Sequence, residues 1–134
     1  QPTGRYRIRN FMRPMYYKRD GTQYEGTPDD PRGSLLWAKD WGDRPHKIIS
    51  QTTLPNGNFV STVWLGLDHS FGEDGPPLIF ETMVFPKKGI WVDVDMERYS
   101  TEEEAVQCHQ RMVKKWSKNS NWIYRIFAFL NKWL

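Results

Sequence analysis

The stretch V-S-T-V-W-L-G-L-D-H-S-F-G-E-D-G-P-P-L-I-F-E-T-M-V-F, residues 60–85, decides the fold that we predict for this chain. It holds two apolar runs, 60–67 and 78–85, around a loop of Asp, His, Gly and Pro. In both runs the positions on each side of the strand are largely apolar, since successive side chains point to opposite faces. Strands with two apolar faces lie inside a sheet. We therefore expect residues 60–85 to supply two central strands.

Further strands are expected on both sides of this pair. The Asn-Gly dipeptide at 56–57 indicates a hairpin that joins a strand over 47–54 to the strand over 59–67. A last strand is predicted over 90–97, where apolar and charged residues alternate so that one face is solvated. Residues 15–24 are expected to form a small hairpin around an Asp-Gly turn.

Capping signals indicate where helices begin. Asp30 before Pro31 is typical of a helix start, and Gly42 is expected to end that short helix. Ser100 with Glu103 reads as a capping box at the start of a longer helix. Its apolar stripe at three- and four-residue spacing consists of Ala105, Val106, His109, Met112, Val113 and Trp116.

The fold class predicted is α+β. We expect a mostly antiparallel twisted sheet of four to six strands, with the C-terminal helix packed on one face and a second amphipathic helix in the tail. A chain of 134 residues builds one core. The expected organisation is a basic arm over 1–14, a single domain over 15–118 and an amphipathic helix over 119–134.

Composition excludes several classes of protein. The chain has one cysteine, Cys108, so neither an intramolecular disulfide nor a multi-cysteine zinc site can form. No apolar run approaches the roughly 18 residues of a membrane span, and the N-terminus has no apolar signal core. We expect a protein of a reducing intracellular compartment, with no resident cofactor or metal.

Charge is concentrated at the two ends. Residues 1–19 and 105–134 each carry six basic and no acidic residues, while all sixteen acids lie in between. Basic ends suit nucleic acid or an acidic protein, but they can equally fold back on the acidic middle. The arm residues proposed to bind a partner are Arg5, Arg7, Arg9 and Arg13.

The tail offers apolar candidates for partner binding, namely Trp122, Ile126, Phe127 and Trp133. Such a helix could complete the core, join two copies of the chain, dock in a groove of a partner or lie on a membrane surface.

Three segments carry a resemblance to a known family. They read VSTVWLGLDH at 60–69 with FG at 71–72, PPLIFETMVF at 76–85, and ERYSTEEEA at 97–105. With these segments the chain, over about residues 15–117, resembles a family of small phage- and prophage-encoded proteins of unassigned activity. The resemblance implies an accessory phage protein in the cytoplasm of an infected or lysogenic bacterial host. It would bind and inhibit a host protein or ribonucleoprotein, as anti-defence proteins of the anti-CRISPR kind do.

The polar loop between the two central strands is the expected site, because loops on a rigid sheet often carry function. Its candidate residues are Asp68, His69, Phe71, Glu73 and Asp74. With Glu81 and His109 they could form a carboxylate and imidazole site of a small metal-dependent hydrolase. The structural alternative is that Asp68 caps the turn, His69 bonds loop backbone and His109 packs in the core.

Glu81 interrupts a strand that is otherwise apolar on both sides. A buried carboxylate is costly unless it is paired, and Arg98 is its candidate partner by charge. A third possible function is nucleic-acid or nucleotide binding through the basic ends, with stacking on Trp64, Trp91, Tyr99, Tyr16 or Tyr17. These aromatic residues are equally explained as core.

Overall fold

Four antiparallel strands form one sheet in the computed structural model, which describes residues 16–25, 30–71, 74–118 and 129–132. The strands are β1 (Ile48–Thr53), β2 (Phe59–Trp64), β3 (Phe80–Phe85) and β4 (Asp95–Tyr99). They lie in the order β1-β2-β3-β4, and each neighbouring pair is antiparallel. The pair β2 and β3 is therefore central, as the two-sided apolar pattern predicts.

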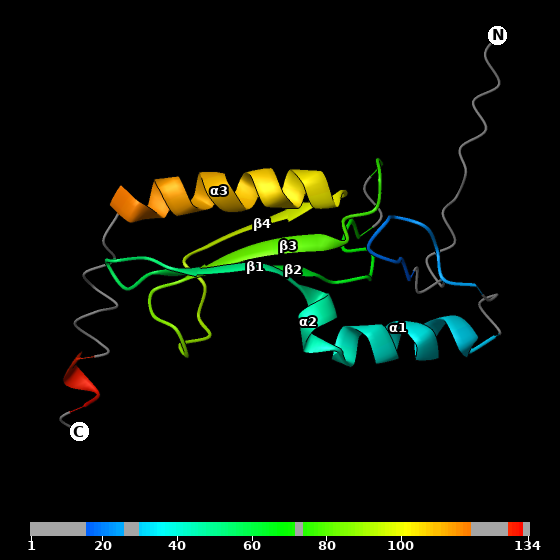
Figure 1. Ribbon diagram of the computed structural model, residues 1–134, viewed down its shortest axis with the longest axis horizontal. Coiled ribbons are helices and arrows are strands. Elements are labelled where there is room, and N and C mark those ends of the chain that lie inside the picture. Colours follow the sequence, from blue (N-terminus) through cyan, green and yellow to red (C-terminus); the bar gives the residue numbers. More distant parts are fainter. Residues whose placement is uncertain (1–15, 26–29, 72–73, 119–128, 133–134) are drawn as a thin grey trace, which may run out of the picture.

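Helix α3 (Glu102–Lys118) lies along one face of this sheet and contacts all four strands (Figure 1). Its buried side chains are Ala105, Cys108, His109 and Met112. Met112 packs with Val60 and Val84 of the central strands, and Ala105 and Cys108 pack with Trp64 and Phe80. The α+β class and the helix on one face are thus confirmed.

The start of α3 differs by one residue from the predicted cap. The Thr101 Oγ1 accepts a hydrogen bond from the Glu104 N–H at 3.2 Å, so Thr101 rather than Ser100 caps the helix. Three acidic residues fill the first turn, where they face the positive end of the helix dipole.

Helices α1 (Arg32–Gly42) and α2 (Arg44–Lys47) lie on the opposite side of the sheet from α3, near one end of it (Figure 1). The helix α1 was predicted, whereas the single turn α2 was not. Trp37 anchors α1, because its Nε1–H donates to the Leu65 carbonyl at 2.9 Å and its ring lies 5.0 Å from that of Tyr16. The expected hairpin around Asp20 is confirmed over residues 16–24 as a short one. Tyr17 and Gln23 form an antiparallel bridge, and backbone hydrogen bonds from Lys18 to Thr22 at 2.7 Å and from Tyr24 to Tyr16 at 3.1 Å flank it.

Several predicted strand boundaries were wrong, and two of them differ most from the structure. The second strand ends at Trp64 instead of residue 67, because the Leu65 and Gly66 N–H groups both donate to the Ile79 carbonyl and the chain turns there. The last strand begins at Asp95 instead of residue 90. Residues 90–94 form a loop whose Trp91 ring packs edge-on against Phe85 at 5.4 Å, so tertiary packing overrides the local alternation.

Most of the predicted arm and tail lies outside the described residues. This includes the proposed contacts Arg5, Arg7, Arg9, Arg13, Trp122, Ile126, Phe127 and Trp133. In the described part of the tail, Phe129 and Leu130 are exposed. No helix within the described ranges is long and apolar enough to cross a membrane.

Gly66 lies at a backbone position that has no room for a side chain. Its φ of +67° lies in the left-handed region, and a Cβ there would sit 2.4 Å from Trp64 Cζ2 and 2.6 Å from Trp37 Nε1. The close approach of two indoles therefore requires glycine.

We expect Gly66→Ala to lower the free energy of unfolding by about 2–4 kcal/mol, because the added methyl group displaces an indole and the φ angle is strained. Urea denaturation measures this loss. The control Gly42→Ala adds a methyl group that meets no atom within 4 Å, at the end of α1, and should be neutral or slightly stabilising. Equal effects of the two substitutions would contradict the packing at Gly66.

Candidate functional site

The loop between β2 and β3 is held by its own polar side chains. The Asp68 Oδ1 accepts hydrogen bonds from the Ser70 N–H at 2.8 Å and from the Leu78 N–H at 3.1 Å. The His69 Nδ1 lies 2.7 Å from the Leu67 carbonyl, and the His69 N–H donates to the Leu78 carbonyl at 2.9 Å. Because a carbonyl only accepts, we assign the Nδ1–H tautomer to the neutral ring. Asp68 caps the turn and His69 bonds backbone, as the structural alternative predicts.

Phe71 stands out from this loop. Its φ of 48° makes it the one residue other than glycine with a positive φ among the described residues, and its side chain is 77 % exposed. A bulky residue in this region of backbone space is strained by about 1–3 kcal/mol. Its ring meets the His69 ring edge-on at 5.7 Å, and the Arg98 Cζ lies 5.9 Å from its centroid. The loop thus holds an exposed aromatic ring in place although the backbone of Phe71 is strained.

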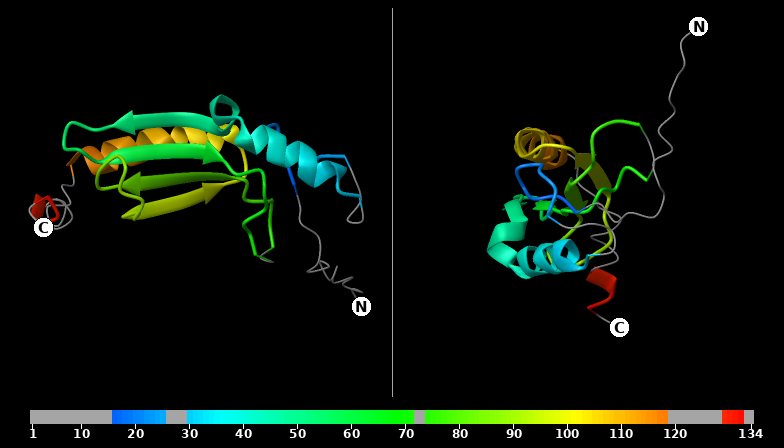
Figure 2. Two further views of the ribbon diagram at one scale, coloured as in Figure 1. Left: turned by 90° about the horizontal axis from the view of Figure 1, so that it is seen from below. Right: turned by 90° about the vertical axis from the view of Figure 1, so that its right-hand side faces the viewer.

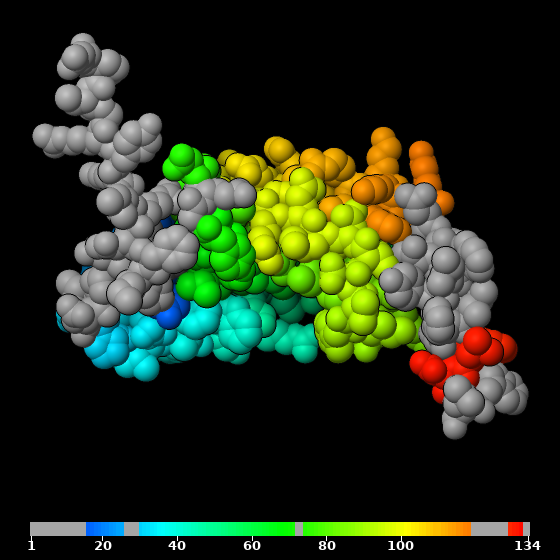
Figure 3. All heavy atoms as spheres, turned by 180° about the vertical axis from the view of Figure 1, so that it is seen from behind, coloured from blue at the N-terminus to red at the C-terminus, as the bar shows by residue number. Residues whose placement is uncertain are grey.

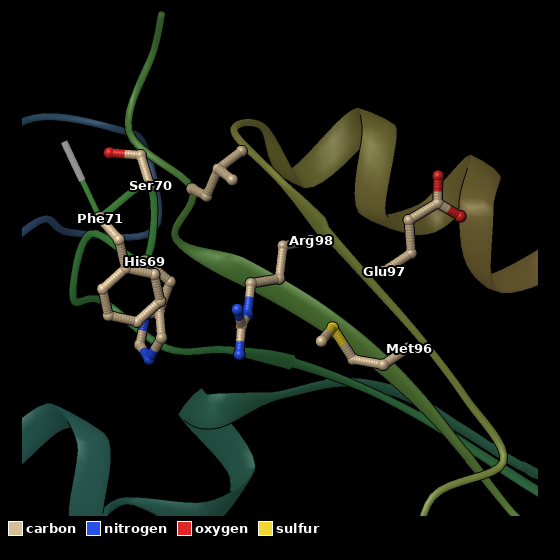
Figure 4. A pocket seen from close by; sticks show the side chains of 7 residues that line it. His69, Ser70, Phe71, Met96, Glu97 and Arg98 are labelled. Atoms are coloured by element: carbon tan, nitrogen blue, oxygen red, sulfur yellow. The ribbon is translucent and has the colours of Figure 1, made fainter. Parts of the chain in front are cut away.

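A shallow pocket of about 440 Å³ lies between this loop and β4. Its lining residues are His69, Ser70, Phe71, Leu78, Met96, Glu97 and Arg98. The side chains of His69, Phe71 and Arg98 extend to one side, whereas Glu97 points toward α3 (Figure 4). There Glu97 accepts a hydrogen bond from Arg111 Nη2 at 2.7 Å. The pocket therefore presents an aromatic ring, a thioether and a guanidinium.

Arg98 is held by Glu81, which stands opposite it in the β3–β4 register. The Arg98 Nε donates to Glu81 Oε2 at 2.9 Å, and the Glu81 side chain is almost completely buried. The predicted pairing of these two residues is confirmed. Glu81 positions the guanidinium beside Phe71, and the guanidinium in turn gives the buried Glu81 carboxylate a charged hydrogen-bond partner.

His109 lies on the other face of the sheet. Its Nδ1 is 2.7 Å from Thr62 Oγ1, and its Nε2 is 2.8 Å from Thr52 Oγ1. Thr62 also bonds Thr82, the neighbour of Glu81 on β3. Because adjacent residues of a strand point to opposite faces, the sheet separates Glu81 from His109. His109 is the packed, hydrogen-bonded residue of the structural alternative.

Among the residues that the structure describes, the predicted carboxylate and imidazole cluster is therefore not assembled. Within the ranges that the structure describes, no three His, Cys, Asp or Glu side chains are grouped so that they could hold a metal ion. Asp74 is exposed and does not line the pocket, and Glu73 lies outside the described residues. The structure does bring three side chains together: His69 and Phe71 of the loop, and Arg98, which is paired with Glu81.

Apart from Arg98, which was predicted only as the partner of Glu81, four lining residues of the pocket were missed as site residues: Ser70, Leu78, Met96 and Glu97. Met96 precedes Arg98 by two residues and lies on the same face of β4, a signal that a correct strand boundary would have provided. Of the aromatic residues considered for stacking, Trp64, Tyr17 and Tyr99 are buried in the core, while Trp91 is 74 % exposed. Tyr16 packs on Trp37.

Comparisons of the chain with protein-family models, with curated proteins and with solved structures found no match.

Glu81 is expected to be structural. Glu81→Gln should lower the free energy of unfolding by about 1–2 kcal/mol, because it removes the charge that pairs with a partly buried guanidinium. The matched control is Glu97→Gln in the more exposed pair with Arg111, which should cost less than about 1 kcal/mol. Urea denaturation of both variants measures the difference, and a loss at Glu81 no larger than at Glu97 would refute the pairing as a stabilising contact.

His109 should make stability depend on pH. Burial lowers the pKa of His109 from the ordinary value of 6.5, so the folded state binds its proton less readily than the unfolded state does. Stability is then full above pH 6.5 and falls as the pH drops toward the folded-state pKa, by at most about 1.4 kcal/mol per pH unit. An NMR titration of the His109 ring should give a midpoint below 6.5. A midpoint above that value would contradict the buried, neutral ring.

Proposed function

We propose that this protein acts by binding a partner protein, and that its contact surface is the pocket between the 68–71 loop and β4. The observation that carries this proposal is the conformation of Phe71. Its ring is exposed although the backbone beneath it is strained, and the hydrogen bonds that Asp68 accepts and His69 donates maintain that arrangement. Strain kept at an exposed side chain is typical of functional sites.

The composition of the pocket supports a protein partner. Aromatic residues, Met and Arg are enriched where proteins meet, and the pocket joins Phe71, Met96 and Arg98. Its acid–base side chains already have partners, since the His69 Nδ1 bonds the Leu67 carbonyl and Glu97 pairs with Arg111. Binding contacts are therefore better supported than catalysis.

A narrower proposal rests on the family resemblance of residues 60–105. By it, the partner is a host factor that this chain inhibits without catalysis in an infected bacterial cell, with anti-phage defence as the process affected. The predicted basic arm over 1–14 and the amphipathic helix predicted over 119–134 are proposed as additional contacts, with host protein, nucleic acid or a second copy of the chain as their partners.

Phe71→Gly should separate binding from stability. Glycine adopts the left-handed backbone freely, so the free energy of unfolding should stay constant or rise by up to about 1 kcal/mol. Retention of a host protein on the immobilised chain, measured by quantitative mass spectrometry of a bacterial lysate, should fall by about tenfold or more. The wild-type chain is the reference.

The control variant is Leu35→Ala, which truncates an apolar side chain of similar exposure on α1. It should leave both stability and retention unchanged. If Phe71→Gly retained every protein that the wild-type chain retains, the pocket would not be the contact surface.

A further inference from the structure

Strand β4 forms one rim of the sheet, and among the residues that the structure describes it pairs with β3 alone. It lies at the edge of the sheet in Figure 2, and in Figure 3 it is open on the surface between the loop that follows β2 and the loop that precedes β4. An edge strand presents backbone N–H and C=O groups that no neighbouring strand uses.

The residues that present these groups can be assigned from the hydrogen bonds. The Tyr99 carbonyl accepts from the Ile79 N–H at 2.9 Å, so Tyr99 faces β3. In an antiparallel ladder the N–H and C=O groups of one residue point to the same neighbouring strand, and those of the next residue point to the opposite side. Arg98 and Met96 therefore face away from β3. In agreement, the Met96 N–H donates to Asp95 Oδ1 at 2.9 Å rather than to the sheet.

The side chains of the same two residues line the pocket. A residue placed opposite Arg98 on an added strand would have its Cβ about 4.5–5.5 Å from that of Arg98, on the pocket side of the sheet. A guanidinium at this distance favours a carboxylate. The residue opposite Met96 would meet the thioether, which favours an apolar side chain.

A second copy of β4 fits this edge poorly. Only outward-facing residues can form the hydrogen-bonded pairs, which leaves three registers centred on the strand. They place Glu97 opposite Glu97, Arg98 opposite Arg98, or Asp95 opposite Glu97. Like charges directly opposite each other destabilise a strand pair, so the edge favours a different sequence.

We propose that β4 binds an extended segment of a partner protein as a fifth, antiparallel strand. Because the added strand runs antiparallel to β4, the segment reads acidic, any residue, apolar from its N- to its C-terminus. Its acidic residue lies opposite Arg98 and its apolar residue opposite Met96. This inference rests on the proposed function and names the kind of partner that the same pocket takes.

The test uses a random heptapeptide library displayed on yeast and selected against the full chain. Selected peptides should share the acidic, any, apolar alternation. In a synthetic copy of one such peptide, N-methylation of the acidic residue removes the donor to the Arg98 carbonyl and should weaken binding by about tenfold or more. N-methylation of the next residue is the matched control, because its N–H faces away from β4, and it should change affinity little.

Variants of the chain test the side-chain contacts. The double substitution Glu81→Gln with Arg98→Gln leaves no buried carboxylate unpaired and should abolish the preference for an acidic residue while the apolar preference persists. Phe71→Gly should reduce the affinity of the same peptides by about tenfold.

The outcomes separate the two proposals. Peptides that require Phe71 but tolerate every N-methyl group would overturn strand addition and leave the protein-binding pocket standing. If no peptide were enriched, both the strand addition and the protein-binding pocket would be overturned. The same would follow if the chain bound single-stranded oligothymidine in a separate assay and bound no peptide. A dimer in sedimentation equilibrium that the Arg98 double variant abolishes would show that a second copy is the occupant.

Discussion

The register between β2 and β3 is the constraint on which the rest of the structure depends. It places Thr62 opposite Thr82 and Val63 opposite Glu81. A slip of one residue would move every side chain to the other face of the sheet. In the observed register Thr62 bonds both Thr82 and His109 beneath α3, and Glu81 bonds Arg98 on the pocket face. Thr62, Thr82 and Glu81 therefore depend on this register for their hydrogen-bond partners.

The two faces of the sheet consequently have different roles. On the α3 face, buried apolar side chains and the His109 network fix the helix to three threonines of the strands. On the pocket face, the Glu81–Arg98 pair holds a guanidinium at the surface beside Phe71. The buried network that holds α3 and the proposed contact surface are thus built from neighbouring residues of the same strands, with the sheet between them.

Sequence patterns predict the parts of this arrangement that depend on local periodicity and charge. The two-sided apolar strands, the stripe of α3 and the Glu81–Arg98 pair follow from alternation, helical spacing and the cost of a buried carboxylate. Other features depend on contacts between distant segments. The left-handed backbone of Phe71 and the end of β2 at Trp64 result from hydrogen bonds across the loop to Leu78 and Ile79.

The boundary of β4 shows the same limit. Residues 90–97 alternate like a strand, yet Trp91 packs on Phe85 and the ladder begins only at Asp95. The pocket is lined by Met96 and Arg98 on one face of β4, and the strand predicted over 90–97 did not include Arg98. The sequence therefore predicted the loop and Glu81 as parts of the site, but not the contribution of β4.

Amide hydrogen exchange along β4, measured by NMR on the free chain, tests this arrangement most directly. Glu97 and Tyr99 face β3, so their N–H groups should exchange slowly, whereas the outward-facing Arg98 N–H should exchange fast. Slow exchange at Arg98 with fast exchange at Glu97 would contradict the register, and with it both the pocket and the open edge.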